Sequence, residues 1–361
     1  MRPLALRAAR LFDGLGSVDQ PTVLIDDGRV LAVDGGRVEP PPDADVVDFG
    51  DATLLPGLID THVHLGFDGT AETVGRLKAD DDGRLLLRMR LAAQRSLAAG
   101  VTTVRDLGDR GYLALALRDW FAQGDEVGPE ILASGPPLTV TGGHCWFMGG
   151  EADGEAELRR AVRTRAKRGV DVIKVMATGG NLTAGIDAFT PQYTVAELAA
   201  VVDEAHRFGR RVNAHVHGVR GIEWAVEAGV DGLEHCGFWV PDGVHAEERL
   251  IDRIAEREIV VCPTAGIVPG GPPPPPAVAS RLPAMMEVGR RMHRAGVRLV
   301  AGTDAGVAPP KPHGLVAYAV SAMADAGLPT LDVLRAATSM AADACGLAGR
   351  KGVLAAGADA D

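Results

Sequence analysis

The sequence has little of several features that mark particular classes of protein. It contains four cysteines, and no two of them stand in a CxxC spacing, which argues against a disulfide framework or a thiolate zinc site and fits a reducing compartment. No stretch approaches the roughly 20 apolar residues of a membrane-spanning helix, and the N-terminal residues lack the apolar core of a signal peptide. We therefore expect a cytoplasmic protein that does not enter a membrane.

Acidic residues outnumber basic ones, 48 to 37. The formal net charge is -11, which argues against nucleic acid or an acidic membrane surface as a partner. The chain has only five lysines, so Lys174, which lies within the apolar run Val-Ile-Lys-Val-Met, stands out. We expect small molecules to be the main partners, and assembly into a homo-oligomer stays open.

The pattern along the chain changes at residue 53. Residues 1–52 are typical of a small β layer, with short strands expected at 4–11, 22–26, 29–33 and 46–49. From residue 53 on, apolar runs typical of strands alternate with amphipathic segments typical of helices. The expected strands cover residues 53–59, 102–106, 130–134, 172–176, 212–215, 232–235, 260–263 and 298–302.

A repeated junction supports this division. Gly100, Gly169, Gly229 and Gly296 each follow an expected helix and precede a valine that opens a strand. Glycine takes the left-handed conformation that ends a helix at little cost, so the junction predicts a turn from helix to strand. Eight strands alternating with helices predict a (β/α)₈ barrel of TIM type over residues 53–345. An open doubly wound sheet is the alternative, but no GxGxxG follows the first strand.

Ionisable residues stand at or just past the ends of these strands. Residues two apart on a strand point to the same face, so His62 and His64 can bind one ion together. The carboxyl ends of all strands meet at one mouth of a barrel, where imidazoles, a carboxylate and a buried amine form a set that binds divalent metal for hydrolysis. Each residue alone has a structural explanation, but six at the same end of their strands are hard to attribute to chance. They are His62, His64, Lys174, His215, His235 and Asp304.

This order of residues resembles the amidohydrolase superfamily over nearly the whole chain. The segments 174–180 (KVMATGG), 214–218 (AHVHG), 234–235 (EH) and 302–306 (GTDAG) are similar to its prolidase-like, imidazolonepropionase-related group. Deaminases of the superfamily usually carry a glutamate three residues after the histidine of the fifth strand. Here that position is Gly218, which favours a hydrolase with two metal ions.

The resemblance implies two divalent metal ions. His62, His64 and Asp304 would bind the more buried ion, and His215 and His235 the second. Zinc is expected, although such ligands also accept Mn, Co or Fe. Lys174 would carry a carbamate formed from CO₂ that bridges both ions; burial lowers the pKa of a lysine, so that its neutral amine can react. A buried Lys174 paired with a carboxylate is the alternative.

The implied reaction is hydrolysis by a metal-bridging hydroxide. Asp304 would be the catalytic residue, taking the proton of the hydroxide and passing it to the leaving amine. His217 shares a strand face with His215 and is the alternative ligand; otherwise it contacts substrate. His144 and Tyr193 lie in loops after the third and fourth strands, where they either bind substrate or pack the loops. His313 would border the pocket or cap a helix.

The expected activity is cleavage of an amide bond in a small substrate, such as an Xaa-Pro or Xaa-Arg dipeptide or an N-acyl amino acid. The alternative is a cyclic amide, lactone or ester hydrolase with the same metals. Pocket charge separates them, because a dipeptide needs a cationic contact for its carboxylate, for which Arg220 is a candidate. A catalytically inactive scaffold would lack ligands, and none is missing.

The resemblance also bears on the ends of the chain. Related proteins form an N-terminal β-sandwich, which strands near their C-terminus complete. We therefore expect residues 1–52 to be the N-terminal part of such a sandwich. Residues 346–361 would begin the return to it, with the final strands absent from this sequence.

Overall fold

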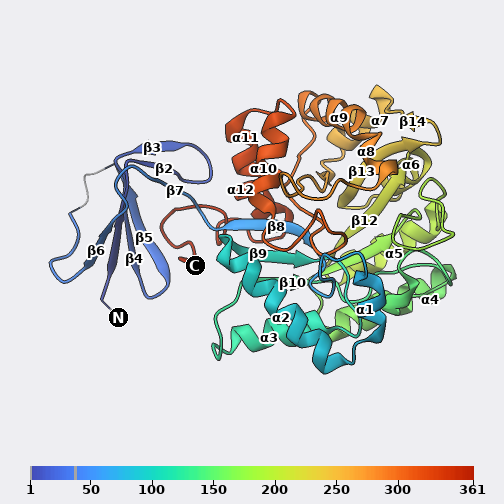
Figure 1. The fold of residues 1–361 in the computed structure, drawn as a ribbon, viewed down its shortest axis with the longest axis horizontal. Coiled ribbons are helices and arrows are strands. Elements are labelled where there is room, and N and C mark those ends of the chain that lie inside the picture. Colours follow the sequence, from blue (N-terminus) through green and yellow to red (C-terminus); the bar gives the residue numbers. More distant parts are fainter. Residues whose placement is uncertain (1, 36–38) are drawn as a thin grey trace.

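The structure is a computed structural model that describes residues 2–35 and 39–361. A barrel of strands wrapped by helices makes up most of the molecule, and a small layer of N-terminal strands lies beside it (Figure 1). The chain passes from the layer to the barrel between Leu54 and Leu58.

Within the described residues, seven regular strands and one irregular segment close the barrel. The strands are β8 (Leu58–Val63), β9 (Val101–Asp106), β10 (Glu130–Ala133), β11 (Val172–Met176), β12 (Arg211–Gly218), β13 (Gly232–Val240) and β15 (Val260–Cys262). The pairs β8–β9, β9–β10, β11–β12, β12–β13 and β13–β15 are parallel, and a bridge from Leu138 to Val175 joins the two sheets. The fold is a TIM-type (β/α)₈ barrel, as predicted.

The eighth position of the barrel differs from the prediction of a strand at 298–302. Only single parallel bridges form there, from Leu299 to Val261 and from Ala305 to Val63. The ladder is interrupted because the amide of Ala301 donates to the carbonyl of Ala336 in a helix instead of a neighbouring strand.

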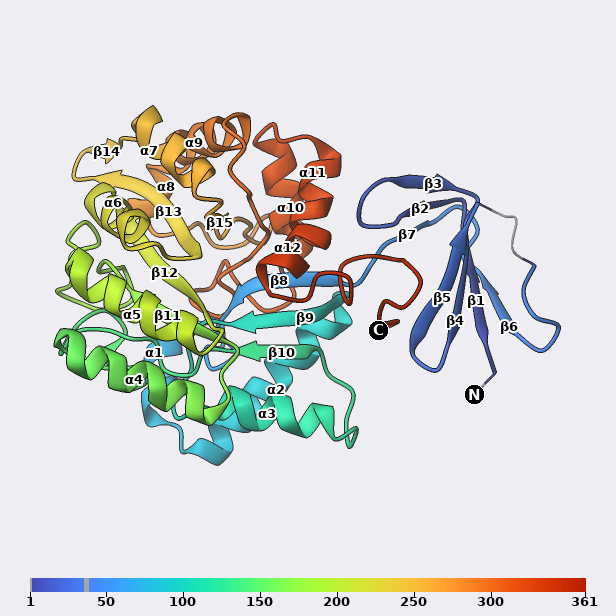
Figure 2. The same ribbon diagram turned by 180° about the vertical axis from the view of Figure 1, so that it is seen from behind.

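Helices follow the strands and cover the outside of the barrel (Figures 1 and 2). They are α1 (Thr73–Ala79), α2 (Asp82–Ala98), α3 (Leu113–Ala122), α4 (Gly154–Arg168), α5 (Val195–Arg207), α6 (Val219–Ala228), α7 (Glu248–Glu256), α8 (Pro276–Ala279), α9 (Leu282–Arg294), α10 (Val316–Asp325), α11 (Thr330–Ala336) and α12 (Ser339–Ala344). A short 3₁₀ helix covers Trp146–Met148, and the two-residue strand β14 covers Gly243–Val244. The four junction glycines all have φ near +80°, which confirms the predicted turns. No described helix is long and apolar enough to cross a lipid bilayer.

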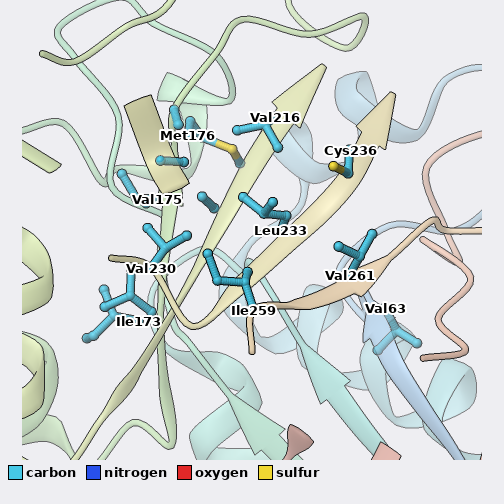
Figure 3. Packing of buried hydrophobic residues seen from close by; sticks show 14 of the residues in the cluster. Val63, Ile173, Val175, Met176, Val216, Val230, Leu233, Cys236, Ile259 and Val261 are labelled. Atoms are coloured by element: carbon cyan, nitrogen blue, oxygen red, sulfur yellow. The ribbon is translucent and has the colours of Figure 1, made fainter. Parts of the chain in front are cut away.

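Alternation along the strands separates the core from the site. Ile173 and Val175 of β11, with Val216 of β12 and Leu233 of β13, belong to the large apolar cluster beneath the helices (Figure 3). Lys174, one residue from each of the first two, therefore points to the opposite face, into the barrel. The same two-residue period places His215 and His217 of β12 and Glu234 of β13 on the face opposite Val216 and Leu233.

The N-terminal layer consists of two small sheets. One contains β1 (Leu4–Arg7), β4 (Thr22–Asp26), β5 (Arg29–Asp34) and β6 (Asp45–Asp48), and the other β2 (Arg10–Phe12), β3 (Ser17–Asp19) and β7 (Thr53–Leu54). The predicted strands at 4–11 and 53–59 are thus each two strands, because the chain passes from one sheet to another at Ala8 and at Pro56.

The C-terminal residues return to this layer. Asp359 forms an antiparallel bridge with Arg29 at β5, and Leu354 packs with Leu11, Val23 and Val30 in a small apolar cluster. Figure 2 shows this segment between the barrel and the N-terminal sheets.

Candidate metal centre

The first cluster of ligand atoms joins the two ends of the barrel sequence. His62 lies in β8, His64 just follows it, and Asp304 follows the irregular eighth segment. The two Nε2 atoms lie 3.3 Å apart, and each is 3.4 Å from Oδ1 of Asp304. Two imidazole lone pairs and a carboxylate oxygen this close repel one another unless they share a cation or a proton. The three residues form one group able to bind a metal ion.

The other nitrogen of each ring is held by an acceptor. Nδ1 of His62 donates to the carboxylate of Glu234 at 2.7 Å, and Nδ1 of His64 donates to the carbonyl of Gly108 at 3.0 Å. Because a carboxylate and a carbonyl only accept here, the protons sit on Nδ1 and the lone pairs on Nε2. This is the tautomer that metal-binding histidines take.

The second cluster gathers His215 and His217 of β12 with His235 of β13, whose ligand atoms lie within 4.8 Å of one another. Nε2 of His215 donates to the carbonyl of Gly179 at 3.0 Å, which leaves Nδ1 with a lone pair. Nδ1 of His235 bonds to the hydroxyl of Thr264 at 2.9 Å, which leaves Nε2. His217 differs, since its buried Nδ1 has no hydrogen-bond partner among the described residues.

Backbone strain is concentrated at this mouth. His235, Thr264 and Asp304 all have left-handed φ values, between +50° and +66°, at the ends of three neighbouring segments of the barrel. Such conformations cost roughly 1–3 kcal/mol each in a residue other than glycine and cluster at functional sites. These strained backbone conformations therefore orient side chains that belong to the candidate site.

Burial sets the protonation of the histidines. Loss of hydration lowers the pKa of His64 to about 3 and holds the pKa values of His62, His215 and His235 well below the usual range. All four are therefore neutral at pH 7, the form that binds metal. Burial raises the pKa of Asp304 to about 7, because the apolar surroundings disfavour its charged form.

Lys174 lies close enough to both clusters for its charge to act on their histidines. Its side chain is 1% exposed, and Nζ has no hydrogen-bond partner among the described residues. Burial lowers the pKa of this amine, and its charge in turn lowers the pKa values of histidines in both clusters, such as His62 and His215. A buried amine without a partner, beside two sets of neutral imidazoles, fits a lysine that gains a carboxylate and two cations that bind it.

Sequence reasoning missed a buried network beneath the first cluster. Oε1 of Glu234 accepts from Nδ2 of Asn213 at 2.6 Å and from Nη2 of Arg105 at 3.3 Å, while Oε2 holds His62. All these side chains are almost fully buried. Arg105 is a cation inside an apolar strand, as Lys174 is, and that signal was available in the sequence.

Lys311 was also missed, although it is one of five lysines. Nζ donates to the carbonyl of Thr303 at 2.6 Å and to that of Thr264 at 2.8 Å, so it ties together the ends of two segments that carry ligands. Burial lowers its pKa, and the nearby charge of Asp304 opposes that shift. Asp60 also holds the segment that carries Asp304, because it accepts hydrogen bonds from the amide and the hydroxyl of Thr303 at 3.0 and 2.6 Å.

The residues predicted to touch substrate fall into two groups. His144 is buried, with its ring centroid 4.7 Å from that of His215, and its Nδ1 has no partner among the described residues. His217 is equally close to His215. Tyr193, in contrast, is buried with its hydroxyl donating to the carbonyl of Ala152 at 2.9 Å. His313 is buried and bonds to the carbonyl of Phe67 at 2.9 Å.

Comparisons with known proteins agree with this arrangement. Residues 53–361 match the model of the amidohydrolase family. An ochratoxinase of Aspergillus niger is 31% identical over 327 residues, which cover 80% of this chain and 64% of the relative, so the chain spans less than two thirds of that relative's length. An imidazolonepropionase of Symbiobacterium thermophilum is 27% identical over 380 residues, covering 93% and 81% of the two chains.

The same picture comes from solved structures. The crystal structure of a Xaa-Pro dipeptidase with methionine bound in its active site is similar to this chain with a TM-score of 0.85 and 28% identity, over 99% of this chain and 92% of that chain. The likeness therefore extends over the N-terminal layer as well as the barrel.

Proposed function

Because the chain belongs to the amidohydrolase family and is an amidohydrolase enzyme, we propose that it is a two-metal hydrolase of small amides. Its substrates would be Xaa-Pro or Xaa-Arg dipeptides or N-acyl amino acids. The Xaa-Pro dipeptidase and the ochratoxinase named above are similar over most of this chain, which favours a small amide substrate.

The pattern of histidine tautomers carries the proposal. His62, His64, His215 and His235 each use one ring nitrogen on a protein acceptor or hydroxyl and keep the other for a ligand bond. His62, His64 and Asp304 would bind one zinc ion, and His215 and His235 the second, with a carbamate on Lys174 between them. Among the residues that the structure describes, Nδ1 of His217 has no such partner. This favours His215 over His217 as the ligand of the fifth strand.

When bound, the two metal ions would lower the pKa of a water molecule and polarise the substrate carbonyl. Asp304 would accept the proton of the attacking water and deliver it to the leaving nitrogen. Four of the six proposed ligands are buried, while His235 and Asp304 are partly exposed, and low exposure to water strengthens the electrostatic contacts of the site.

His144 and His217 are the proposed substrate contacts. Both are buried and neutral, because burial lowers their pKa values to about 4 and about 3. Within the described part of the chain, each has an Nδ1 without a hydrogen-bond partner, and both rings lie beside that of His215. A neutral imidazole can either donate to a substrate carbonyl or accept from its N–H. Tyr193 would instead hold the loop, since its hydroxyl is already bonded.

The positions of Arg220 and Lys311 support a second candidate, hydrolysis of a cyclic amide, lactone or ester. Arg220, the candidate for a dipeptide carboxylate, is exposed on α6, with its guanidinium 5.3 Å from the ring centre of Trp224. Lys311 spends two donors on backbone carbonyls. A substrate without a free carboxylate needs neither residue.

A hydrolysis panel separates the candidates. The protein, expressed in the presence of zinc and bicarbonate, is assayed on Xaa-Pro and Xaa-Arg dipeptides, N-acyl amino acids, and cyclic amides and lactones. We expect turnover of the linear amides. Activity confined to the cyclic substrates would support the second candidate, and no turnover of any amide or ester would contradict both.

We further propose that residues 1–52 and 346–361 form one β-sandwich unit attached to the barrel of residues 53–345. The shared apolar cluster of Leu11, Val23 and Val30 with Leu354 supports it. The bridge between Arg29 and Asp359 adds a second contact between the two segments.

A further inference from the structure

His217 is held in the site by ring stacking. Its ring lies 4.7 Å from that of His235 at an interplanar angle of 23°, and 4.2 Å from that of Trp239 at 19°. Its Nδ1 is buried without a hydrogen-bond partner among the described residues. Hydrogen bonds orient the proposed ligand histidines, whereas stacking against His235 and Trp239 fixes the plane of the His217 ring.

An irregularity in β13 brings Trp239 to this place. His235, Cys236 and Phe238 have left-handed φ values, and the register between β12 and β13 shifts so that Gly218 pairs with Trp239. Extra residues in one strand redirect its side chains and increase its twist. The irregular strand therefore places the indole beside the ring of His217.

Trp239 is itself fixed from behind. It is 2% exposed, and its Nε1 donates to the sulfur of Met285 at 3.4 Å. The guanidinium of Arg281 lies 5.1 Å from the centre of its ring and donates to the carbonyls of Gly243 and Val240, both at 3.1 Å. An arginine over an indole face is an attractive arrangement. The indole thus has little freedom to rotate.

We propose that Trp239 is a positioning residue, which fixes the ring of His217 so that its nitrogens face the substrate. The inference rests on the proposed function, because it assigns the substrate contact to His217. Without the indole, the imidazole has a flat neighbour on one side only and can turn about its Cβ–Cγ bond. Substrate binding then weakens, while the metal ligands keep their own hydrogen bonds.

Three variants test this: Trp239→Leu, Trp239→Phe and the control Trp224→Leu. Trp224 also lies beside an arginine, Arg220, but on the outer helix α6. With the best substrate of the panel, we expect Trp239→Leu to raise KM about tenfold, the size of one lost net hydrogen bond, with kcat and metal content nearly unchanged. Phenylalanine keeps a flat face and should restore KM to within about threefold. Trp224→Leu should leave KM as in the wild type.

The combination with His217→Ala shows whether Trp239 acts through His217. If it does, adding Trp239→Leu to His217→Ala has no further effect on KM, because coupled residues are not additive. Additive effects would overturn the proposal, as would an equal loss of metal or melting temperature that phenylalanine does not rescue.

Crystal structures of the two leucine variants give a test that needs no substrate. We expect the His217 ring to be turned in Trp239→Leu and unmoved in Trp224→Leu. An unmoved ring in Trp239→Leu overturns the inference whether or not the enzyme hydrolyses amides. A turned ring in a protein that hydrolyses nothing supports the positioning and contradicts the proposed function alone.

Discussion

The two clusters of ligand atoms are built differently, although they share one barrel mouth. The first has an anionic member, Asp304, and a second carboxylate behind it, because Glu234 accepts from His62. The second consists of imidazoles supported by a carbonyl and a hydroxyl, those of Gly179 and Thr264. A divalent cation is therefore stabilised by protein charge in the first cluster. In the second, the proposed carbamate on Lys174 would supply that charge.

This difference indicates how one fold could bind one metal ion tightly and a second ion whose binding depends on a modified side chain. Carboxylates next to a cation offset its charge directly, and a carboxylate behind a histidine makes the ring a stronger ligand. Neutral imidazoles lack that contribution. In the proposed centre the second cluster would therefore depend on the carbamate of Lys174, and its third ring, His217, would be left available for substrate.

The largest effect is expected for Lys174→Ala. If Lys174 carries the proposed carbamate, this change removes an anionic ligand of the second ion. We then expect kcat/KM to fall by more than about 1,000-fold, an amount consistent with loss of one metal's contribution. The assay is hydrolysis of the best panel substrate. Lys167→Ala, an exposed lysine of α4, serves as control and should retain full activity. A kcat/KM within tenfold of the wild type in Lys174→Ala would mean that the second cluster does not depend on this lysine.

Asp304→Asn should come next. The amide keeps the shape of the side chain but cannot take a proton, so kcat should fall by about 100- to 10,000-fold, the range of general acid–base catalysis. Steady-state kinetics measure this, and elemental analysis of the same sample separates loss of proton transfer from loss of metal. A variant that keeps its metal and loses less than tenfold in kcat would remove Asp304 from the catalytic role.

The supporting residues compare the clusters directly. Glu234→Gln should weaken binding of the first ion by about 10- to 100-fold, as is typical when an outer partner of a ligand is lost. Thr264→Val removes a neutral hydroxyl behind His235 and should weaken the second ion less. Competition with a zinc chelator gives both affinities. Equal losses, or a larger one for Thr264→Val, would contradict the electrostatic difference between the clusters.

The smallest effect concerns the pH dependence of stability in the metal-free protein. The folded-state pKa of His217 is about 3, below the roughly 6.5 of an unfolded chain. As the pH falls below 6.5, His217 binds a proton in the unfolded state but stays neutral in the folded state. Acid therefore lowers the free energy of unfolding by up to about 1.4 kcal/mol per pH unit for this group. His217→Asn should therefore lose less stability on acidification. The free energy of unfolding of both proteins is measured by denaturation at several pH values from 7 to 5. An equal decrease in variant and wild type would disprove this prediction.

Much of the fold follows from patterns that lie close together in the sequence. The four helix-to-strand junctions could be predicted because a left-handed turn needs glycine, as the φ of +82° at Gly100 shows. The split of residues 4–11 into β1 and β2 could not, since the apolar run continues through Ala8 and Ala9. The irregular eighth segment depends on a contact between Ala301 and Ala336 in a distant helix.

The site divides in the same way. His62, His64 and Lys174 are visible because each interrupts or ends an apolar run with a two-residue period. Glu234 could be read only as the neighbour of His235; its partner His62 is 172 residues away in sequence. Trp239 reaches His217 through left-handed residues in β13 that no local pattern predicts.

The most direct test of the account is the number of divalent ions per chain in the wild type and in Lys174→Ala, measured by elemental analysis after loading with zinc in bicarbonate. We predict two ions in the wild type and one in the variant, with the remaining ion held by His62, His64 and Asp304. The same number in both proteins, or fewer than two in the wild type, would contradict a two-metal centre bridged by the modified lysine.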